Sequence, residues 1–281
     1  MAPTTALTDT IKFEQSLLDR RPWAELPSRH WRYRLGYVPS TESLTTQQNG
    51  QDYLELRFGV DSKRNLKFVF AICDGVGSSY RGDVAARSMG DWLCNTMWGK
   101  WGDTISAVQL GDNLWKRLKE MPPEVVNPID DEPIPDDIPA LMRSALTRQR
   151  EVGSQTMFIG GRLTQGKLSF ASCGDLRLFV LDDEFNSLYT YRPDTDSRWS
   201  SKRGVIGEIV PHVIDDPEMM RHVRHIIAHS DGLKDAELWK LSDAELSDHI
   251  GMLQAREDSD DISYVHIELT DPPVQRPLFS E

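Results

Sequence analysis

The apolar run Phe68–Cys73, with the aspartate that ends it, constrains the fold more than any other feature of the sequence. The run is apolar on both faces, which is typical of a strand buried inside a large core. Asp74 follows at its C-terminal end, and Gly75 and Gly77 then let the backbone turn closely around whatever Asp74 holds. A carboxylate in this position suits a hard cation, which prefers oxygen ligands. The alternative is a strand-end aspartate that satisfies a turn, since Asp-Gly is a common turn dipeptide.

Acidic residues stand beside apolar strands at two further places. Asp231 and Gly232 follow the apolar run 226–228, and the pair Asp260–Asp261 directly precedes the alternating strand 262–269. Three acidic strand ends are hard to explain by turns alone. Together they favour one shared centre that binds metal through carboxylate oxygens.

Hydrophobic periodicity predicts strands first, then helices, then strands again, with one more helix before the last strand. Strands are expected at 31–37, 53–59, 66–73, 156–163, 167–173, 176–181, 225–229 and 262–269. Helices are expected at 82–100, 104–121, 141–152 and 242–255. Many strands are separated by hairpin-sized gaps, which favours antiparallel sheets with helices packed outside them over an alternating parallel fold. The predicted fold class is therefore α+β, a layered sandwich.

The length of the chain, 281 residues, is sufficient for one large domain, and we expect one. Residues 1–30 are expected to form an N-terminal extension laid on that domain, and residues 271–281 a C-terminal tail. The segment 122–139 is rich in proline and acidic residues and lacks an apolar period, so we expect an exposed acidic loop. The polar segment 191–207 is expected to be a loop or flap.

The charge of the chain argues against nucleic acid as a partner. Acidic residues number 44 against 32 basic ones, which gives a formal net charge of -12. Such a chain repels a phosphate backbone and lacks the counterion-release term that drives affinity for nucleic acid.

The cysteines and the N-terminus indicate a cytoplasmic protein. Cys73, Cys94 and Cys173 are odd in number, widely spaced and set in apolar runs, which is typical of small buried thiols in a reducing compartment. Residues 1–10 lack both a basic start and an apolar stretch, and no apolar run approaches the roughly 20 residues of a membrane span. We therefore expect no membrane association.

Five short motifs occur in an order that resembles a known family. They are Asp74-Gly75-Val76-Gly77, Gly153-Ser154-Gln155-Thr156, Cys173-Gly174-Asp175-Leu176-Arg177, Ser230-Asp231-Gly232 and Asp260-Asp261-Ile262-Ser263. They are similar to the ordered motifs of the metal-dependent protein serine/threonine phosphatases of type 2C, in their bacterial form. The resemblance spans residues 31–270 and implies a four-layer α-β-β-α sandwich of two mostly antiparallel sheets flanked by helices.

The resemblance also implies a pair of Mn²⁺ or Mg²⁺ ions in the cleft between the sheets. Asp74 would bridge the two ions, and the carbonyl oxygen of Gly75 would bind one of them. Asp231 and Asp260 would bind the other ion. The first acidic motif of the family falls at residues 49–52, which would make Asp52 a further ligand, directly or through water. The competing interpretation of Asp52 is a surface turn residue after a polar run.

The activity that the resemblance implies is hydrolysis of phosphoserine and phosphothreonine by a hydroxide that bridges the two ions, without a covalent intermediate on the protein. The partner would be a phosphoprotein, and the enzyme would oppose a serine/threonine kinase in signalling.

The phosphate-binding position departs from the family pattern. Gln47 stands where the resemblance leads us to expect an arginine, and an uncharged amide cannot give a bidentate, charge-assisted grip. Either Arg57, Arg81 or another basic residue takes that role, or substrate binding is weak.

Three other positions bear on the chemistry of the predicted site. Val76 replaces the histidine of many eukaryotic relatives, which would leave protonation of the leaving group to a metal-bound water. Glu151 is the one acid placed to bind a third metal ion, which we do not expect. The segment Asp175–Arg177 is expected to be mainly a structural turn.

Two rival functions come from other classes. The first is a catalytically weak or inactive module that keeps a phosphatase fold for binding or regulation, and it is favoured by Gln47. The second is a two-metal nuclease or small-molecule phosphoesterase. The net charge of -12 opposes a nuclease, and the histidine ligands of many such centres are missing.

Overall fold

A computed structural model describes residues 6–12, 19–25, 31–46, 49–60, 66–99, 106–164, 166–233, 237–256 and 258–270. The strands are β1 (Ala6–Lys12), β2 (Asp19–Glu25), β3 (Trp31–Val38), β4 (Tyr53–Val60), β5 (Leu66–Gly75), β6 (Gln155–Thr164), β7 (Lys167–Cys173), β8 (Arg177–Leu181), β9 (Ser187–Tyr191), β10 (Arg198–Ser200), β11 (Gly204–Ile206), β12 (Val210–Ile214), β13 (His225–His229) and β14 (Ile262–Leu269). The helices are α1 (Thr41–Thr46), α2 (Gly82–Gly99), α3 (Ala107–Lys119), α4 (Pro123–Asp130), α5 (Ala140–Val152), α6 (Pro217–His222) and α7 (Asp243–Gln254), with short 3-10 turns η1 (Asp231–Leu233) and η2 (Leu238–Lys240).

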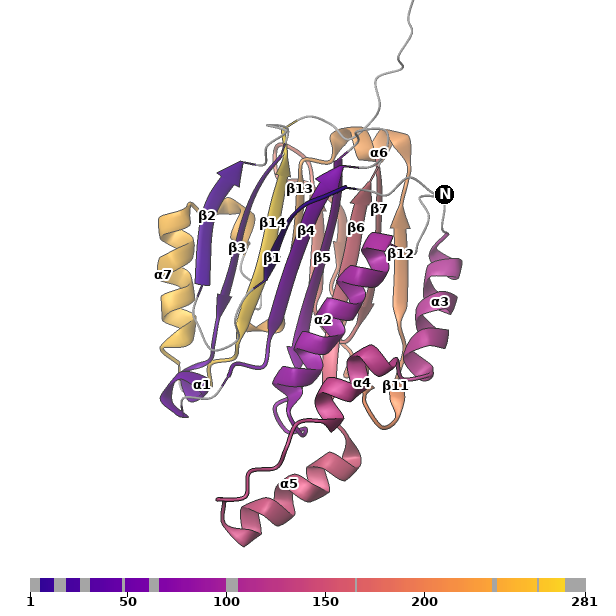
Figure 1. The fold of residues 1–281 in the computed structure, drawn as a ribbon. Helices are drawn as coiled ribbons and strands as arrows, with labels where there is room; N and C mark the ends of the chain where they lie inside the picture. Colours follow the sequence, from indigo (N-terminus) through magenta and orange to yellow (C-terminus); the bar gives the residue numbers. More distant parts are fainter. Residues whose placement is uncertain are drawn as a thin grey trace, which may run out of the picture.

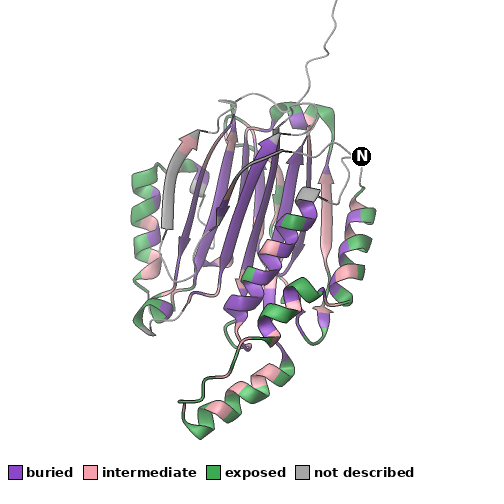
Figure 2. Ribbon diagram, in the orientation of Figure 1, coloured by how far each residue is buried: buried purple, intermediate pink, exposed green. Residues whose placement is uncertain are grey.

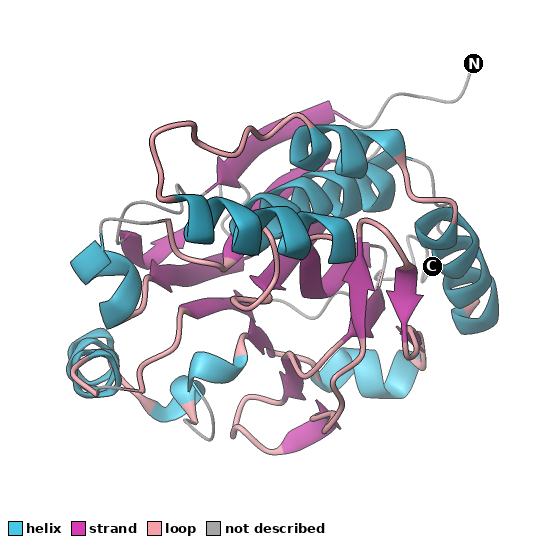
Figure 3. Ribbon diagram, turned by 90° about the horizontal axis from the view of Figure 1, so that it is seen from below, coloured by secondary structure: helices cyan, strands magenta, loops and turns pink. Residues whose placement is uncertain are grey.

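Two antiparallel sheets form the centre of the molecule, and helices cover them (Figure 1). The first sheet runs β1-β4-β5-β6-β7-β12, and the β10–β11 hairpin pairs with the start of β6. The second sheet runs β2-β3-β14-β13-β8-β9. Figure 3 views the molecule from below and shows helices on the outer sides of the strands. The predicted α+β sandwich of two antiparallel sheets flanked by helices is confirmed.

The strand pair β4–β5 shows why the central strands are apolar on both faces. Leu54 and Phe70 point inward and join the core between the two sheets. Val69 and Cys73 point outward and join a second core beneath α2, with Met89. Every second residue of β4 and β5 therefore enters one core and the intervening residues enter the other, so these central strands are buried on both faces (Figure 2). The three cysteines are buried free thiols.

The N-terminal segment contributes strands, which differs from the extension laid on the domain that the sequence suggested. β1 pairs with β4 at one edge of the first sheet, and β2 pairs with β3 at one edge of the second. No helix in the described parts of the chain is long and apolar enough to cross a membrane. The expected C-terminal tail, 271–281, lies outside the described residues.

The acidic segment 122–139 is not a loop throughout, and that expectation was wrong for its first half. Residues Pro123–Asp130 form α4, with proline in the first turn, where its missing N–H removes no hydrogen bond. Val125 and Ile129 lie one turn apart and are both buried. Burial of these two apolar residues, which have helical spacing, stabilises α4 although prolines surround them.

The segment 191–207 was also expected to be a loop or flap, and its second half is instead the β10–β11 hairpin. Trp199 in β10 is fully buried, and its indole Nε1–H donates to the carbonyl oxygen of Leu118 (3.1 Å). Burial of this large ring holds the hairpin against α3.

Candidate metal centre

The end of β5 brings Asp74 to the edge of the first sheet. Its carbonyl oxygen accepts a hydrogen bond from Thr156 Oγ1 (2.8 Å), and the Gly75 N–H donates to the carbonyl oxygen of Gln51 (3.1 Å). A Cβ on Gly75 would lie 2.4 Å from the Gly82 carbonyl oxygen and 2.7 Å from that of Gln51. Only glycine therefore allows the turn after Asp74 to pack against both neighbouring segments.

Asp52 lies directly before β4 and is 1% exposed, so it is not a surface turn residue. Its Oδ2 atom is buried and has no hydrogen-bond partner among the described residues. The neighbouring Gly50 is required by space, because a Cβ there would lie 1.8 Å from the hydroxyl oxygen of Tyr37. A buried carboxylate oxygen without a donor is an atom that a cation would satisfy.

Asp261 holds the two sheets together at this point. Its Oδ1 accepts the backbone N–H of Ser40 (2.5 Å), and its Oδ2 accepts those of Gln51 and Asp52, the latter at 3.0 Å. In the sequence, Asp261 stands out only as the neighbour of Asp260, and nothing in the pattern predicts its role. A buried carboxylate that accepts three backbone N–H groups is structural, and it fixes Asp52 beside the start of β14.

Asp231 begins η1, directly after β13. Ser230 and Ser263 pair through the Ser230 N–H and the Ser263 carbonyl oxygen (2.9 Å), and Ser263 N–H donates to Ser230 Oγ (2.9 Å). A Cβ on Gly232 would lie 2.0 Å from the carbonyl oxygen of Asp261. This close approach places Asp231 next to the segment that carries Asp260, whose side chain is exposed.

Electrostatic effects show that the predicted ligands lie near one another. Burial, followed by the negative charges of Asp74, Asp261 and Asp260, raises the pKa of Asp52 well above its ordinary value. Burial likewise raises the pKa of Asp74, and the charges of Asp231, Asp260 and Asp175 raise it further. Carboxylates gathered in this way repel one another and favour a cation among them.

Asp175 belongs to the same group, although its segment was expected to be mainly a structural turn. It follows Gly174, whose φ of +114° is a conformation suited to glycine. Burial first, and the charges of Asp260 and Asp194, raise its pKa, although Arg177 acts in the opposite direction. Its Oδ1 is buried without a hydrogen-bond partner in the described parts of the chain.

The donor chemistry fits Mg²⁺ or Mn²⁺, because it consists of carboxylate oxygens beside a glycine turn. The positions of these oxygens relative to one another are not those of a formed metal site. Within the described ranges, no three acidic, histidine or cysteine side chains are arranged so that they could hold an ion as they stand. The carboxylates are therefore gathered at one edge of the sandwich but do not form a ready-made coordination shell.

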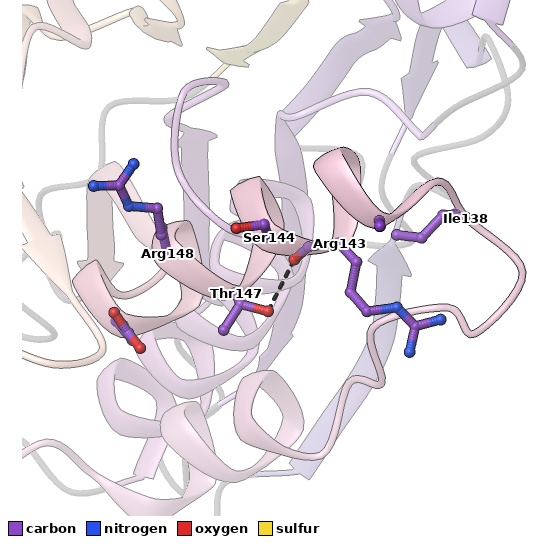
Figure 4. A pocket seen from close by; sticks show the side chains of 7 residues that line it. Ile138, Arg143, Ser144, Thr147 and Arg148 are labelled. Carbon is purple, nitrogen blue, oxygen red and sulfur yellow. Dashed lines mark hydrogen bonds between the residues drawn. The ribbon is translucent and has the colours of Figure 1, made fainter.

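A hollow of about 680 Å³ lies along α5, and none of the predicted ligands of the metal pair lines it, although Glu151 does. Figure 4 shows Arg143 and Arg148 extending from α5 beside this hollow, with Ser144 and Thr147 between them. α5 itself has no buried residue and lies beyond the ends of the strands (Figure 1). Gln149 Nε2 donates to the carbonyl oxygen of Ser78 (3.3 Å), which ties the helix to the turn after Asp74.

The two arginines considered in place of Gln47 lie in different surroundings, and Gln47 itself is outside the described residues. Arg57 is buried on the α2 side of the first sheet, where it pairs with Glu55 and donates to Asn95 Oδ1 (2.6 Å). Arg81 lies in the turn between Asp74 and α2, with its side chain 33% exposed. Arg81 is therefore the one of the two that lies on the side of the carboxylate group.

Comparison with models of known protein families finds no match for this sequence, and comparison with curated proteins finds none either. Solved structures do match. A bacterial serine phosphatase is 14% identical, with 84% of this chain and 97% of that chain covered and a TM-score of 0.51. RsbX in complex with magnesium is 15% identical, with 90% and 100% covered and a TM-score of 0.52. The serine/threonine phosphatase Stp1 from Staphylococcus aureus is 12% identical, with 84% and 94% covered and a TM-score of 0.53. At these identities the likeness concerns the fold, and the chain has the fold of the type 2C serine/threonine phosphatases.

Proposed function

We propose that the chain is a metal-dependent phosphatase that hydrolyses phosphoserine and phosphothreonine in proteins. The observation that carries the proposal is the group of carboxylates from five separate segments, with the buried Oδ2 of Asp52 lacking a hydrogen-bond donor in the described region. Two of the three solved structures described above are phosphatases by name, and that of RsbX contains magnesium. We further propose a cytoplasmic protein that opposes a serine/threonine kinase in signalling.

The proposed ligands are Asp52, Asp74, the Gly75 carbonyl oxygen, Asp231 and Asp260, with Asp175 as an additional candidate. When bound, two Mn²⁺ or Mg²⁺ ions supply an activated water and neutralise charge on the phosphoryl oxygens. Asp74 is central, because the charges of Asp231 and Asp260 act on it most strongly after burial. Asp261 holds Asp52 in place through the backbone N–H of Asp52, so the Oδ2 atom of Asp52 is left to bind an ion.

The test is hydrolysis of a phosphoserine peptide and of an aryl phosphate with and without Mn²⁺ or Mg²⁺. Asp74→Asn and Asp231→Asn should each reduce the metal-dependent rate by at least about a hundredfold, because each removes a charge that holds an ion. Asp112→Asn on the exposed face of α3 is the matched control and should have no effect. Full activity in both of the first two variants, with circular dichroism unchanged, would refute the proposal.

The alternative is a regulatory or binding module that keeps the fold without efficient catalysis. Gln47 favours it, because an amide cannot clamp a phosphate as arginine does. The absence of a ready-made set of three ligands in the described ranges agrees with it. Calorimetric titration separates the two functions: no binding at millimolar Mn²⁺ supports the module, and micromolar binding supports the enzyme.

A further inference from the structure

Arg81 is held in a fixed orientation next to the turn that carries Asp74. Its backbone has a φ of +48°, which is uncommon for a residue with a side chain. The next residue, Gly82, packs so closely that a Cβ there would lie 2.6 Å from Gln51 Oε1 and 2.8 Å from the carbonyl oxygen of Val76. The side chain of Arg81 therefore starts beside the segments that carry Asp52 and Asp74.

Asp83 orients the guanidinium of Arg81. Nε donates to Asp83 Oδ1 and Nη2 to Oδ2, both at 2.9 Å, which is the two-bond geometry of an arginine–carboxylate pair. Burial by itself would raise the pKa of Asp83, but the hydrogen bonds and charge of Arg81 outweigh burial and lower it. Asn49 Nδ2 also donates to Asp83 Oδ2 (3.2 Å), which links the pair to the segment before Asp52.

The remaining edge of the guanidinium is occupied by an acid from the chain itself. Arg81 Nη1 donates to Glu132 Oε1, and the Tyr80 hydroxyl donates to the Glu132 carbonyl oxygen (2.9 Å). Glu132 belongs to the acidic segment 122–139 and lies two residues after the end of α4. Lys202 pairs with Asp130 of this segment (2.9 Å).

The contact between Arg81 and Glu132 is suited to exchange. The two side chains are 33% and 30% exposed, and an ion pair in contact with solvent contributes little to stability. A carboxylate and a phosphate monoester present similar oxygen geometry to a guanidinium, but the phosphate carries more negative charge and more acceptor oxygens. A phosphorylated side chain can therefore displace Glu132 while Asp83 keeps its two hydrogen bonds.

We propose that Arg81 binds the phosphoryl group of the substrate, and that Glu132 occupies the same guanidinium as an internal competitor when substrate is absent. This inference rests on the proposed phosphatase function and names the residue that supplies the missing positive charge at Gln47. Arg57 does not compete for this role, since it is buried beneath α2 and paired with Glu55.

The experiment measures two quantities on the full chain: the Kd of inorganic phosphate in the presence of Mn²⁺, and KM and kcat for a phosphoserine peptide. Glu132→Gln should lower both Kd and KM by up to about fivefold with kcat unchanged, since a half-exposed ion pair is replaced. Arg81→Ala should raise both by about tenfold or more, and Arg81→Lys should restore only part of the loss, because lysine lacks the fork geometry.

The double variant separates this inference from a general charge effect. In an Arg81→Ala background, Glu132→Gln should give no further gain, because the guanidinium for which Glu132 competes is gone. Glu124→Gln on α4 and Arg148→Ala on α5 remove the same charges at exposed positions and should leave Kd and KM unchanged.

The outcomes for the two proposals are distinct. An active enzyme whose phosphate affinity is unaffected by Arg81→Ala, or whose gain from Glu132→Gln persists in that background, overturns the inference and leaves the phosphatase function standing. Phosphate binding that depends on Arg81 and is improved by Glu132→Gln, in a protein without hydrolytic activity, supports the inference and overturns the phosphatase function.

Discussion

Glu55 should make the stability of the protein depend on pH in an unusual direction. Its side chain lies beneath α2, and the Tyr53 hydroxyl stands between two acids, 3.1 Å from Glu55 Oε2 and 2.9 Å from Asp91 Oδ1. Burial, followed by the interaction with Asp91, raises the pKa of Glu55 from 4.5 to about 7, and Arg57 offsets this only in part. The folded protein therefore holds a proton that the unfolded chain releases.

The magnitude follows from the two pKa values. Below pH 4.5 the carboxyl is protonated in both states and its contribution is fully present; it is lost as the pH rises through about 7. At about 1.36 kcal/mol for each pKa unit, the free energy of unfolding should fall by about 3 kcal/mol across this range. Glu55→Gln keeps the shape of the side chain and removes the titration.

The assay is urea denaturation at half-unit intervals from pH 4.5 to 8.5. The difference between the wild type and Glu55→Gln isolates Glu55 from every other titrating group, and it should change by about 3 kcal/mol over this range. Glu124→Gln, at an exposed position, should give a curve parallel to the wild type. If the wild-type and Glu55→Gln curves are also parallel, Glu55 does not carry a raised pKa and the reasoning is wrong.

Two further predictions concern the carboxylate group. Without metal, Asp74→Asn should melt at a higher temperature than the wild type, because it removes a half-buried carboxylate that neighbouring acids repel. The variant should also lose the stabilisation that Mn²⁺ gives the wild type, about 2.7 kcal/mol at a hundred times Kd. A wild-type melting temperature that stays the same when Mn²⁺ or a chelator is added would contradict this. Gly232→Ala should destabilise the fold by roughly 1–3 kcal/mol and weaken Mn²⁺ binding, since its Cβ would lie 2.0 Å from the Asp261 carbonyl oxygen. Gly251→Ala, which meets nothing within 4 Å, is the control, and equal effects of the two changes in denaturation and calorimetry would exclude this explanation.

The sequence predicted the fold class and three acidic strand ends because both depend on local patterns. The run before Asp74 is apolar at every position, and each face enters its own core, so the strand and its end are readable from neighbouring residues. α4 was missed because Val125 and Ile129 are its only buried apolar residues and prolines surround them.

The interactions that organise the site could not be predicted, because they join distant parts of the chain. Asp261 accepts backbone N–H groups of Gln51 and Asp52, which precede it by 210 and 209 residues. Glu132 reaches Arg81 from 51 residues away. Contacts of this kind, from a side chain to a backbone group or side chain far along the chain, leave no periodic signal, since each depends on where two separate turns meet.

The three backbone hydrogen bonds of Asp261 make this edge of the sandwich a fixed connection between the two sheets. Asp52 leads into the first sheet, whereas Asp261, with Asp260 beside it, leads into the second. A cation bound by both Asp52 and Asp260 would therefore act on the segments that the hydrogen bonds of Asp261 already join. Binding at the carboxylate group should restrain the ends of both sheets together, so slower amide exchange in β4 and β14 would report a binding event there.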